Sequence, residues 1–198
     1  MDITWALGFS ESDLLAALAR QERWAQQALY EQYYSKMMGI CLRYASSRDE
    51  AIDLLHESFI KIFRSIHRYQ QGTSLGGWMR TIVINTCIDY HRRSIRRRTE
   101  SLEEAYTLAA QEPDALSHLT EQEILEAVQR LSPVYRAVFN LYVVEGYSHK
   151  EIAEALQITE STSRSNLMKA RSKLQEYLSK YQPADVQANA TDRNQPDA

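Results

Sequence analysis

Helical spacing of apolar residues, divided by helix-start signals, is the feature that most constrains this chain. Three segments open with a hydroxyl residue followed three positions later by Glu, at Ser47–Glu50, Thr120–Glu123 and Ser148–Glu151. In this pattern each of the two side chains accepts a bond from a free backbone amide, so the pattern marks the start of a helix. Gly and Pro number only 6 and 4 among 198 residues, and no run alternates in the way a strand requires. The sequence therefore predicts an all-α fold.

Charge is segregated along the chain, although the net charge is only −3. Residues 20–98 carry 14 Lys and Arg against 7 Asp and Glu, whereas residues 99–126 carry eight acidic groups and no cation. The acidic segment contains Pro113 and few large apolar residues, which is typical of a flexible linker. We expect two small helical domains at 10–98 and 120–181, joined by a flexible acidic linker at 99–119 and followed by a disordered tail at 182–198.

Each predicted domain contains four helices. In the first domain they begin near Ser10, Ala25, Ser47 and Leu75. In the second domain they begin near Thr120, Pro133, Ser148 and Glu160. Ser132-Pro133 serves as helix cap and first helical residue, because Pro needs no amide partner there.

The cysteines, the histidines and the apolar segments of the chain argue against several classes of protein. Cys41 and Cys87 lie in apolar helical segments, so we expect two reduced core residues. No Cys/His spacing resembles a zinc motif, and His67, His91, His118 and His149 are scattered on polar faces. We therefore predict no metal, no cofactor and no catalytic residue. The chain has no apolar stretch of membrane-spanning length and no signal-peptide pattern, so we expect a cytoplasmic protein without direct membrane insertion.

Residues 147–171 have the pattern of a helix-turn-helix. A first helix from Ser148 to Leu156 is followed by a three-residue turn, and small Ala153 permits a close crossing by the second helix. The second helix lacks Asp and Glu from Ser161 to Leu174. Its hydroxyls, amide and cations are groups that bond phosphates and base edges. The candidate DNA-binding residues are Ser161, Thr162, Arg164, Ser165, Asn166, Lys169 and Arg171.

Arginines lie near aromatic residues over residues 64–98. Arginines neutralise phosphates and aromatic rings stack on unpaired bases, so this pattern favours single-stranded or melting DNA. A base pulled from the stack needs a pocket, and the glycines around Gly76-Gly77 let backbone approach it. Trp78 fits a core position and a DNA contact equally well. The candidate residues here are Tyr69, Trp78, Arg80, Asn85, Arg92, Arg93 and Arg96.

The motifs resemble, in their order, a family of bacterial transcription factors. DEAIDLLHESF at 49–59, GWMRTIVIN at 77–85 and LSPVYR at 131–136 precede the helix-turn-helix. Together they resemble the extracytoplasmic-function (ECF) group of sigma-70 family factors over about residues 10–181.

The resemblance implies particular roles. The helix holding Asp53, His56 and Glu57 matches the one that binds the β′ clamp helices of core RNA polymerase, and the second domain matches the one that contacts the β flap. The loop and helix from Tyr69 through Asn85 match the elements that read and open the −10 promoter element. The last helix matches the reader of the −35 element. An anti-sigma factor is a further expected partner.

Two residues depart from the family pattern. His56 stands where Gln is common, and Ser163 stands where an apolar residue packs inward, so we expect a weakened core contact at Ser163. The alternative is a dimeric helix-turn-helix regulator, which leaves the basic-aromatic segment and the acidic linker unexplained. An enzyme would need clustered carboxylates or His/Cys ligands, which the sequence does not show.

Overall fold

The computed structural model describes residues 10–99 and 120–179, and the side chains of residues 94–99 are not described. Every element within those residues is helical, which confirms the predicted fold class. The N-terminal unit comprises α2 (Glu11–Ala19), α3 (Arg23–Tyr44), α4 (Arg48–Ser65), the 3₁₀ turn η1 (Ile66–Arg68) and α5 (Leu75–Thr99). The C-terminal unit comprises α6 (Glu121–Arg130), α7 (Pro133–Phe139), the π-helical turn η2 (Asn140–Val144), α8 (His149–Leu156) and α9 (Glu160–Leu178). The predicted linker after Thr99 and the predicted tail lie outside the described residues.

The predicted helix starts are confirmed. Thr120 with Glu123 and Ser148 with Glu151 form complete capping boxes. At Ser47 the hydroxyl accepts from the Glu50 amide, but the Glu50 carboxylate accepts from the amide of Ser46 (2.8 Å) instead of that of Ser47. These bonds satisfy amides that have no partner inside their own helix, so the helix boundaries follow from local sequence.

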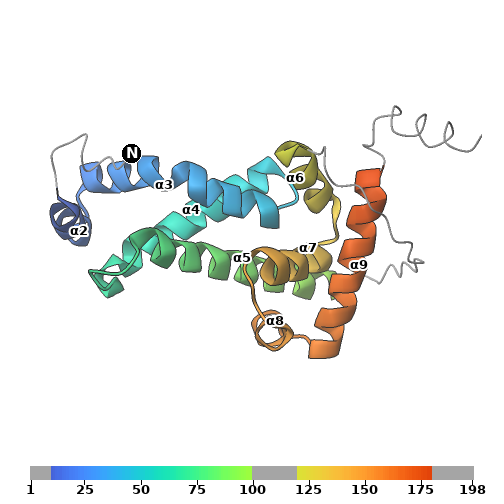
Figure 1. Cartoon of the computed structure of the whole chain (residues 1–198). Coiled ribbons are helices and arrows are strands. Elements are labelled where there is room, and N and C mark those ends of the chain that lie inside the picture. The colour runs from blue at the N-terminus through green and yellow to red at the C-terminus, as the bar shows by residue number, and fades with distance from the viewer. Residues whose placement is uncertain (1–9, 100–119, 180–198) are drawn as a thin grey trace, which may run out of the picture.

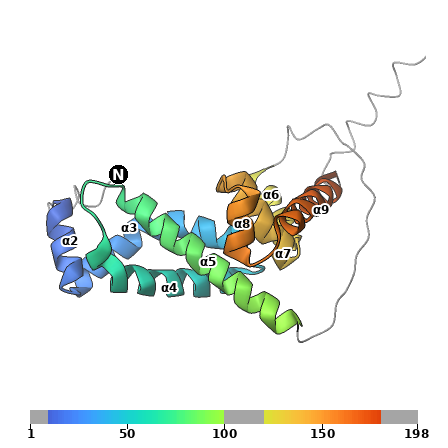
Figure 2. The same ribbon diagram turned by 90° about the horizontal axis from the view of Figure 1, so that it is seen from below.

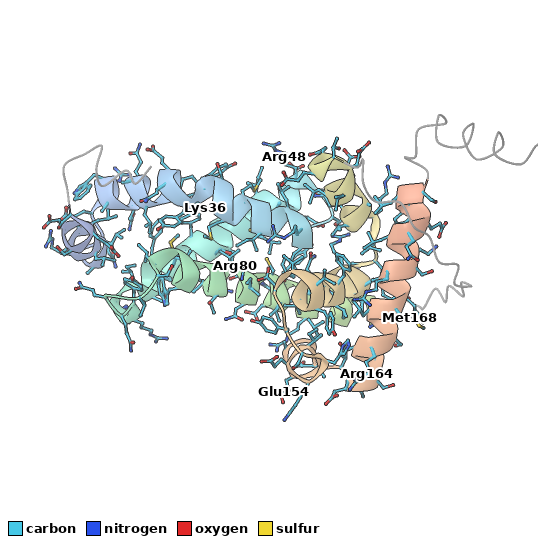
Figure 3. The ribbon with its side chains drawn as sticks, in the orientation of Figure 1. Lys36, Arg48, Arg80, Glu154, Arg164 and Met168 are labelled. Carbon is cyan, nitrogen blue, oxygen red and sulfur yellow. The ribbon has the colours of Figure 1, made fainter. Side chains whose placement is uncertain are left out.

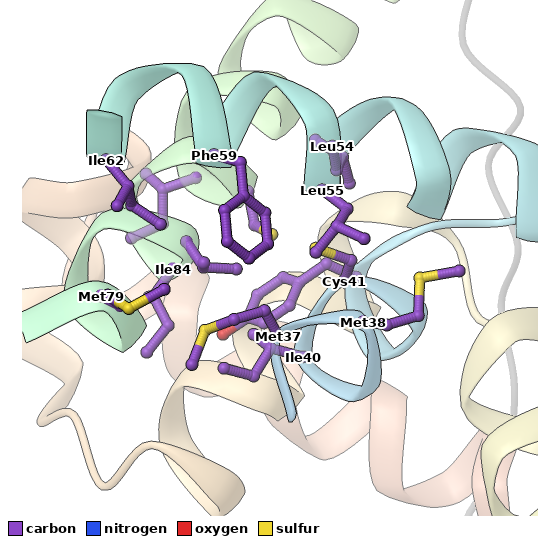
Figure 4. Close-up of a cluster of buried hydrophobic side chains, with 14 of the residues drawn as sticks. Met37, Met38, Ile40, Cys41, Leu54, Leu55, Phe59, Ile62, Met79 and Ile84 are labelled. Carbon is purple, nitrogen blue, oxygen red and sulfur yellow. The ribbon is translucent and has the colours of Figure 1, made fainter. Parts of the chain in front are cut away.

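The core of the N-terminal unit lies between α3, α4 and α5 (Figure 4). Its buried side chains include Met37, Ile40, Cys41, Leu55, Phe59, Ile62, Met79 and Ile84. Burying each large side chain contributes about 1.5–3 kcal/mol, so this packing fixes α5 against its neighbours. Cys41 and Cys87 are buried and free, as predicted.

The C-terminal unit packs directly on the N-terminal unit. The main core continues from α3, α4 and α5 into Val138, Leu141, Ile152, Leu156 and Leu167. Figure 1 shows α6–α9 gathered at the end of the molecule opposite α2, and Figure 2 shows α8 alongside α5. A second, smaller core joins α6 to α9. The two units therefore form one body, a contact that the sequence did not predict.

Candidate nucleic-acid interface

The helix-turn-helix is formed by α8 and α9. Gln157 ends α8 in the left-handed region (φ 57), and its amide donates to the Ala153 carbonyl. Thr159 then caps α9 by accepting from the Thr162 amide (3.0 Å). Ile152 and Leu156 are buried with Leu167 of α9. The predicted three-residue turn and shared core are thus present.

Most of the predicted contact residues share the exposed side of α9. Ser161, Thr162, Arg164, Lys169 and Arg171 are exposed, and Ser165 is half-buried. Arg164 lies 2.6 Å from Glu160, one turn earlier, in an exposed ion pair that contributes little stability. Figure 3 shows Arg164 and Met168 on α9, away from Arg80 in the middle of the molecule.

Two features of α9 differ from the sequence interpretation. Asn166, assigned as a DNA contact, is only 8% exposed and belongs to the buried side of the helix. Met168 was not assigned, yet it is 66% exposed on the same side as Arg164 and Arg171. A large apolar residue in an otherwise polar helix face is the signal that identifies it. Met168 offers the kind of apolar contact that a thymine methyl group accepts.

Ser163 is held by an unexpected hydrogen bond. Its side chain is fully buried, and its Oγ lies 2.9 Å from Nδ1 of His149 at the start of α8. The His149 ring stacks on Tyr142 (ring centroids 4.5 Å apart), and the Arg171 guanidinium lies 6.0 Å from the centre of the Tyr142 ring. Burial, and then the charge of Arg164, lower the pKa of His149. The hydrogen bond replaces the apolar contact whose loss the sequence suggested.

The four histidines named in the sequence analysis differ in their burial and contacts. His149 takes part in the contacts above, and His91 is buried at 4% exposure. Burial, and then the charge of Arg136, lower the pKa of His91 to about 4. The prediction that His91 lies on a polar face was therefore wrong, whereas His149 is half-buried. His67 is exposed, and His118 lies outside the described residues.

Tyr69, which follows η1, packs against Trp78 in the first turn of α5. Tyr69 and Trp78 have ring centroids 5.6 Å apart, and the Tyr69 hydroxyl donates to the Thr73 carbonyl. Tyr69 is buried, so the structure does not present it for stacking on a base, whereas Trp78 is half-buried and serves the core and the surface together. Asn85 is exposed on α5.

A cavity of about 670 Å³ opens between α3 and the start of α5. Tyr33 and Lys36 of α3 line one side, and Gly76, Gly77 and Arg80 of α5 line the other. A Cβ atom at Gly76 would lie 3.1 Å from the Tyr33 ring, so a side chain there would crowd the wall of the cavity.

The three arginines of α5 whose side chains the structure describes, Arg80, Arg92 and Arg93, are engaged within the protein. Arg80 lies 2.5 Å from Glu145, and Arg92 Nε donates to the Ala155 carbonyl (2.6 Å). Arg93 donates to both oxygens of Glu57 (3.0 Å each). The Arg96 side chain is not described.

The predicted polymerase-binding residues lie on α4. Asp53 and His56 are exposed, and Glu57 is half-buried. Glu57 contacts Lys61 (3.1 Å) as well as Arg93. Burial raises the pKa of Glu57, but hydrogen bonds from Lys61 and Arg93 outweigh it and lower that pKa. Glu57 is therefore charged and already paired, whereas Asp53 and His56 face solvent.

No group of His, Cys, Asp or Glu side chains within residues 10–99 and 120–179 is arranged to hold a metal ion. The searched part of the chain also has no helix long and apolar enough to cross a membrane.

The all-helical fold and the helix-turn-helix with exposed cations on α9 together define a helical DNA-binding protein. Residues 29–98 match the family model of sigma-70 region 2, and residues 121–174 match that of sigma-70 region 4. The ECF RNA polymerase sigma factor SigE of Mycolicibacterium smegmatis is 32% identical over 165 residues, which cover 81% of this chain and 64% of SigE. RNA polymerase sigma factor CarQ of Myxococcus xanthus is 30% identical over 156 residues, covering 78% of this chain and 89% of CarQ. The chain belongs to the sigma-70 family of RNA polymerase sigma factors, within its ECF group.

A search of solved structures also found sigma factors. The sigma factor RpoE of Bartonella quintana, solved in complex with the anti-sigma factor NepR, is 22% identical with a TM-score of 0.47. The match covers 79% of this chain and 98% of RpoE.

Proposed function

We propose that this protein is a promoter-recognition subunit that binds core RNA polymerase and directs it to −10 and −35 elements. The observation that carries the proposal is the presence of two separate basic helices, α5 and α9, within a chain of this family. Such a subunit acts by binding and base capture, so no bond-making centre is part of the proposal. We also propose that it acts in the cytoplasm, where the polymerase works.

The exposed side of α9 is the proposed reader of the −35 element. Arg164 and Lys169 supply cations for bases and phosphates, and Ser161 and Thr162 lie beside the free amides of the helix N-terminus, which favour a phosphate. Met168 adds an apolar contact to this set. Asn166 supports the helix from its buried side and is not part of the proposed contact surface.

The start of α5 is the proposed reader of the −10 element. Trp78 is partly exposed, and the cavity beside Gly76 and Gly77 is large enough for an unpaired base. Arg80, Arg92, Arg93 and Arg96 are suited to the phosphates of the opened strand, and exposed Asn85 is suited to a base edge. Flipped bases held in this way would offset the unstacking of the duplex.

The proposed polymerase contacts lie on both units. The face of α4 with Asp53, His56 and Glu57 is proposed to bind the β′ clamp helices, and the C-terminal unit is proposed to bind the β flap. An anti-sigma partner remains a prediction from the family resemblance. No feature of the described residues favours the alternative of a dimeric regulator.

Transcription in vitro with purified core polymerase on a genomic promoter library tests the proposal. We expect specific initiation with the protein and none without it. Arg164→Ala and Lys169→Ala should each weaken binding to the selected −35 element about tenfold, and loss of a phosphate contact should reduce the salt slope by about 1. Arg130→Ala, an exposed cation at the end of α6, is the matched control. Normal promoter use by both α9 variants would show that α9 is not the reader.

A further inference from the structure

The turn η2 presents an aromatic side chain to the helix-turn-helix. Within this turn Leu141 is fully buried, and Asn140 donates to the Arg43 carbonyl at the end of α3 (2.6 Å). Tyr142 follows directly, and it remains 36% exposed. The Tyr142 ring is therefore carried at the surface by a turn that is anchored on both of the preceding residues.

The Tyr142 ring contacts residues of both helices of the helix-turn-helix. The His149 ring of α8 is stacked on it, with centroids 4.5 Å apart and planes 24° apart, and Arg171 Cζ of α9 lies 6.0 Å from its centre. His149 Nδ1 in turn lies 2.9 Å from Ser163 Oγ of α9. Burial, and then the charge of Arg164, lower the pKa of His149, so its ring is neutral at neutral pH and does not repel Arg171.

The contact with Tyr142 leaves Arg171 able to bind an anion. Among the residues that the structure describes, Arg171 forms no ion pair, whereas Arg164 is paired with Glu160 (2.6 Å). An aromatic ring contacts the flat face of a guanidinium, and the N–H groups point outward from its edge. Arg171 can therefore be held by the ring and still donate two parallel hydrogen bonds to a phosphate.

The position of Arg171 on α9 favours a phosphate over a base. Arg171 lies seven residues after Arg164, so it is on the same side of the helix and about 10 Å further along the axis. The major groove is about 12 Å wide, so a cation at this distance from the first turns of α9 meets the edge of the groove, where the phosphates lie. The first helix of a helix-turn-helix crosses the same backbone. Figure 1 shows α8, which begins at His149, beside the first turns of α9.

We propose that Tyr142 is a positioning residue that holds the Arg171 guanidinium against a backbone phosphate at the edge of the groove read by α9. The proposal rests on the function proposed above, in which α9 enters the groove of the −35 element. The ring limits the orientations of Arg171 in the free protein, so less conformational entropy is lost when the phosphate binds. Phosphate contacts set the register of a helix in the groove. Tyr142 therefore influences which bases lie opposite Arg164 without contacting any of them.

Variants of the full chain test this inference by their binding to a fluorescent duplex oligonucleotide of mixed sequence. Binding is measured over a range of salt concentrations, because a phosphate contact needs no particular base. Arg171→Ala removes the cation, Tyr142→Leu removes the ring, and Tyr142→Phe keeps the ring without its hydroxyl. Val143→Ala, at the next residue and 48% exposed, is the matched control. The orientation of Arg171 is measured separately, without DNA, from the ring-current shift of its Hδ protons in NMR spectra.

We expect Arg171→Ala to reduce the salt slope by about 1. Tyr142→Leu should weaken binding about threefold, the effect of a cation–π contact at an exposed site, and it should also remove the shift of the Arg171 Hδ protons. Tyr142→Phe and Val143→Ala should change neither measurement. In a protein that already carries Arg171→Ala, adding Tyr142→Leu should not weaken binding further, because Tyr142 acts through Arg171.

Any of three results would overturn the inference. The first is an unchanged salt slope for Arg171→Ala, and the second is an Hδ shift that persists in Tyr142→Leu. The third is a loss of affinity on Tyr142→Leu that is as large with Arg171→Ala as without it, which would show that Tyr142 supports the fold and not the arginine. Neither measurement uses polymerase or a promoter. Failure to initiate transcription with core polymerase would therefore contradict the proposed function and leave these results standing.

Discussion

At the scale of single residues, the hydroxyl of Ser163 holds α9 in the position proposed for reading DNA. Ser163→Ala leaves the His149 Nδ1 atom without its partner, and we expect a loss of about 1–2 kcal/mol in the free energy of unfolding. Denaturant unfolding measures this loss. The double variant Ser163→Val with His149→Leu removes both polar groups and should recover most of the stability, since apolar replacement of both partners is nearly neutral. A fully stable Ser163→Ala protein would contradict this role of the hydrogen bond.

His91 should make the protein sensitive to acid. Its pKa is lowered to about 4 in the folded state, below the ordinary value of 6.5. The unfolded chain therefore takes up a proton first, and stability present above about pH 6.5 is lost as the pH falls toward about 4. We expect a loss of about 2 kcal/mol between about pH 7.5 and about pH 5 from this residue. Denaturant unfolding of the wild type and of His91→Gln measures it, and an equal loss in both proteins would assign the effect to other groups.

The residues that sequence alone misassigned share a physical reason. Asn166 lies three residues after Ser163 and four before Ala170, and both of these are buried, so helical phase places Asn166 in the core side of α9. Its polar character suggested the opposite. Tyr69 is buried because its loop folds back, with its hydroxyl bonded to the Thr73 carbonyl. Residue type predicted the exposed cations of α9 correctly, but it could not predict which polar groups find partners inside.

At the scale of elements, the residues that cap the helices allowed most of the helix starts to be predicted from the sequence. The starts of α6, α8 and α9 depend on side chains within three residues of each helix start, so the sequence contains the whole signal. The turn η2 was not predicted, since the apolar pattern indicates one continuous helix from Pro133 to Gly146. Within η2, Asn140 is buried and donates to the Arg43 carbonyl, a partner 97 residues away in the sequence.

The cap of α9 offers a test at this scale. Thr159→Ala removes the bond to the Thr162 amide, and we expect a loss of about 1 kcal/mol in the free energy of unfolding. The first turn of α9 carries two of the proposed DNA contacts, so binding to duplex DNA should weaken as well. Thermal unfolding and a DNA titration measure the two effects. Thr81→Ala, an exposed threonine on α5, is the control for loss of a hydroxyl. If the Thr159 variant binds DNA as tightly as the wild type, the cap is not required for DNA binding by α9.

At the scale of the whole molecule, the two units should unfold together. They share the core that contains Val138, Leu141 and Leu167, so neither retains its full buried surface alone. We expect a single transition in calorimetry for the full chain, with equal calorimetric and van't Hoff enthalpies. Two resolved transitions in the wild type would contradict a shared core.

The contact between the two units could not be predicted from the sequence, because the residues that form it are polar and would be expected to face solvent. Gln129 of α6, Arg136 of α7 and Glu145, which follows η2, are polar residues, and their partners in the N-terminal unit are carbonyls and arginines more than 60 residues earlier. Local patterns predict where helices begin and which side is apolar, but they do not predict which distant helix end a polar side chain will meet.

Side chains of the C-terminal unit cap the end of α3, so the stability of this helix end reports whether the two units are in contact. When the units part, three carbonyls at the end of α3 must turn to water, and the last turn of the helix is then free to fray. Deuterium uptake at the backbone amides of residues 42–45 would rise with each separation event, without any label. The exchange rate of one helical turn would thereby record how often the two units separate.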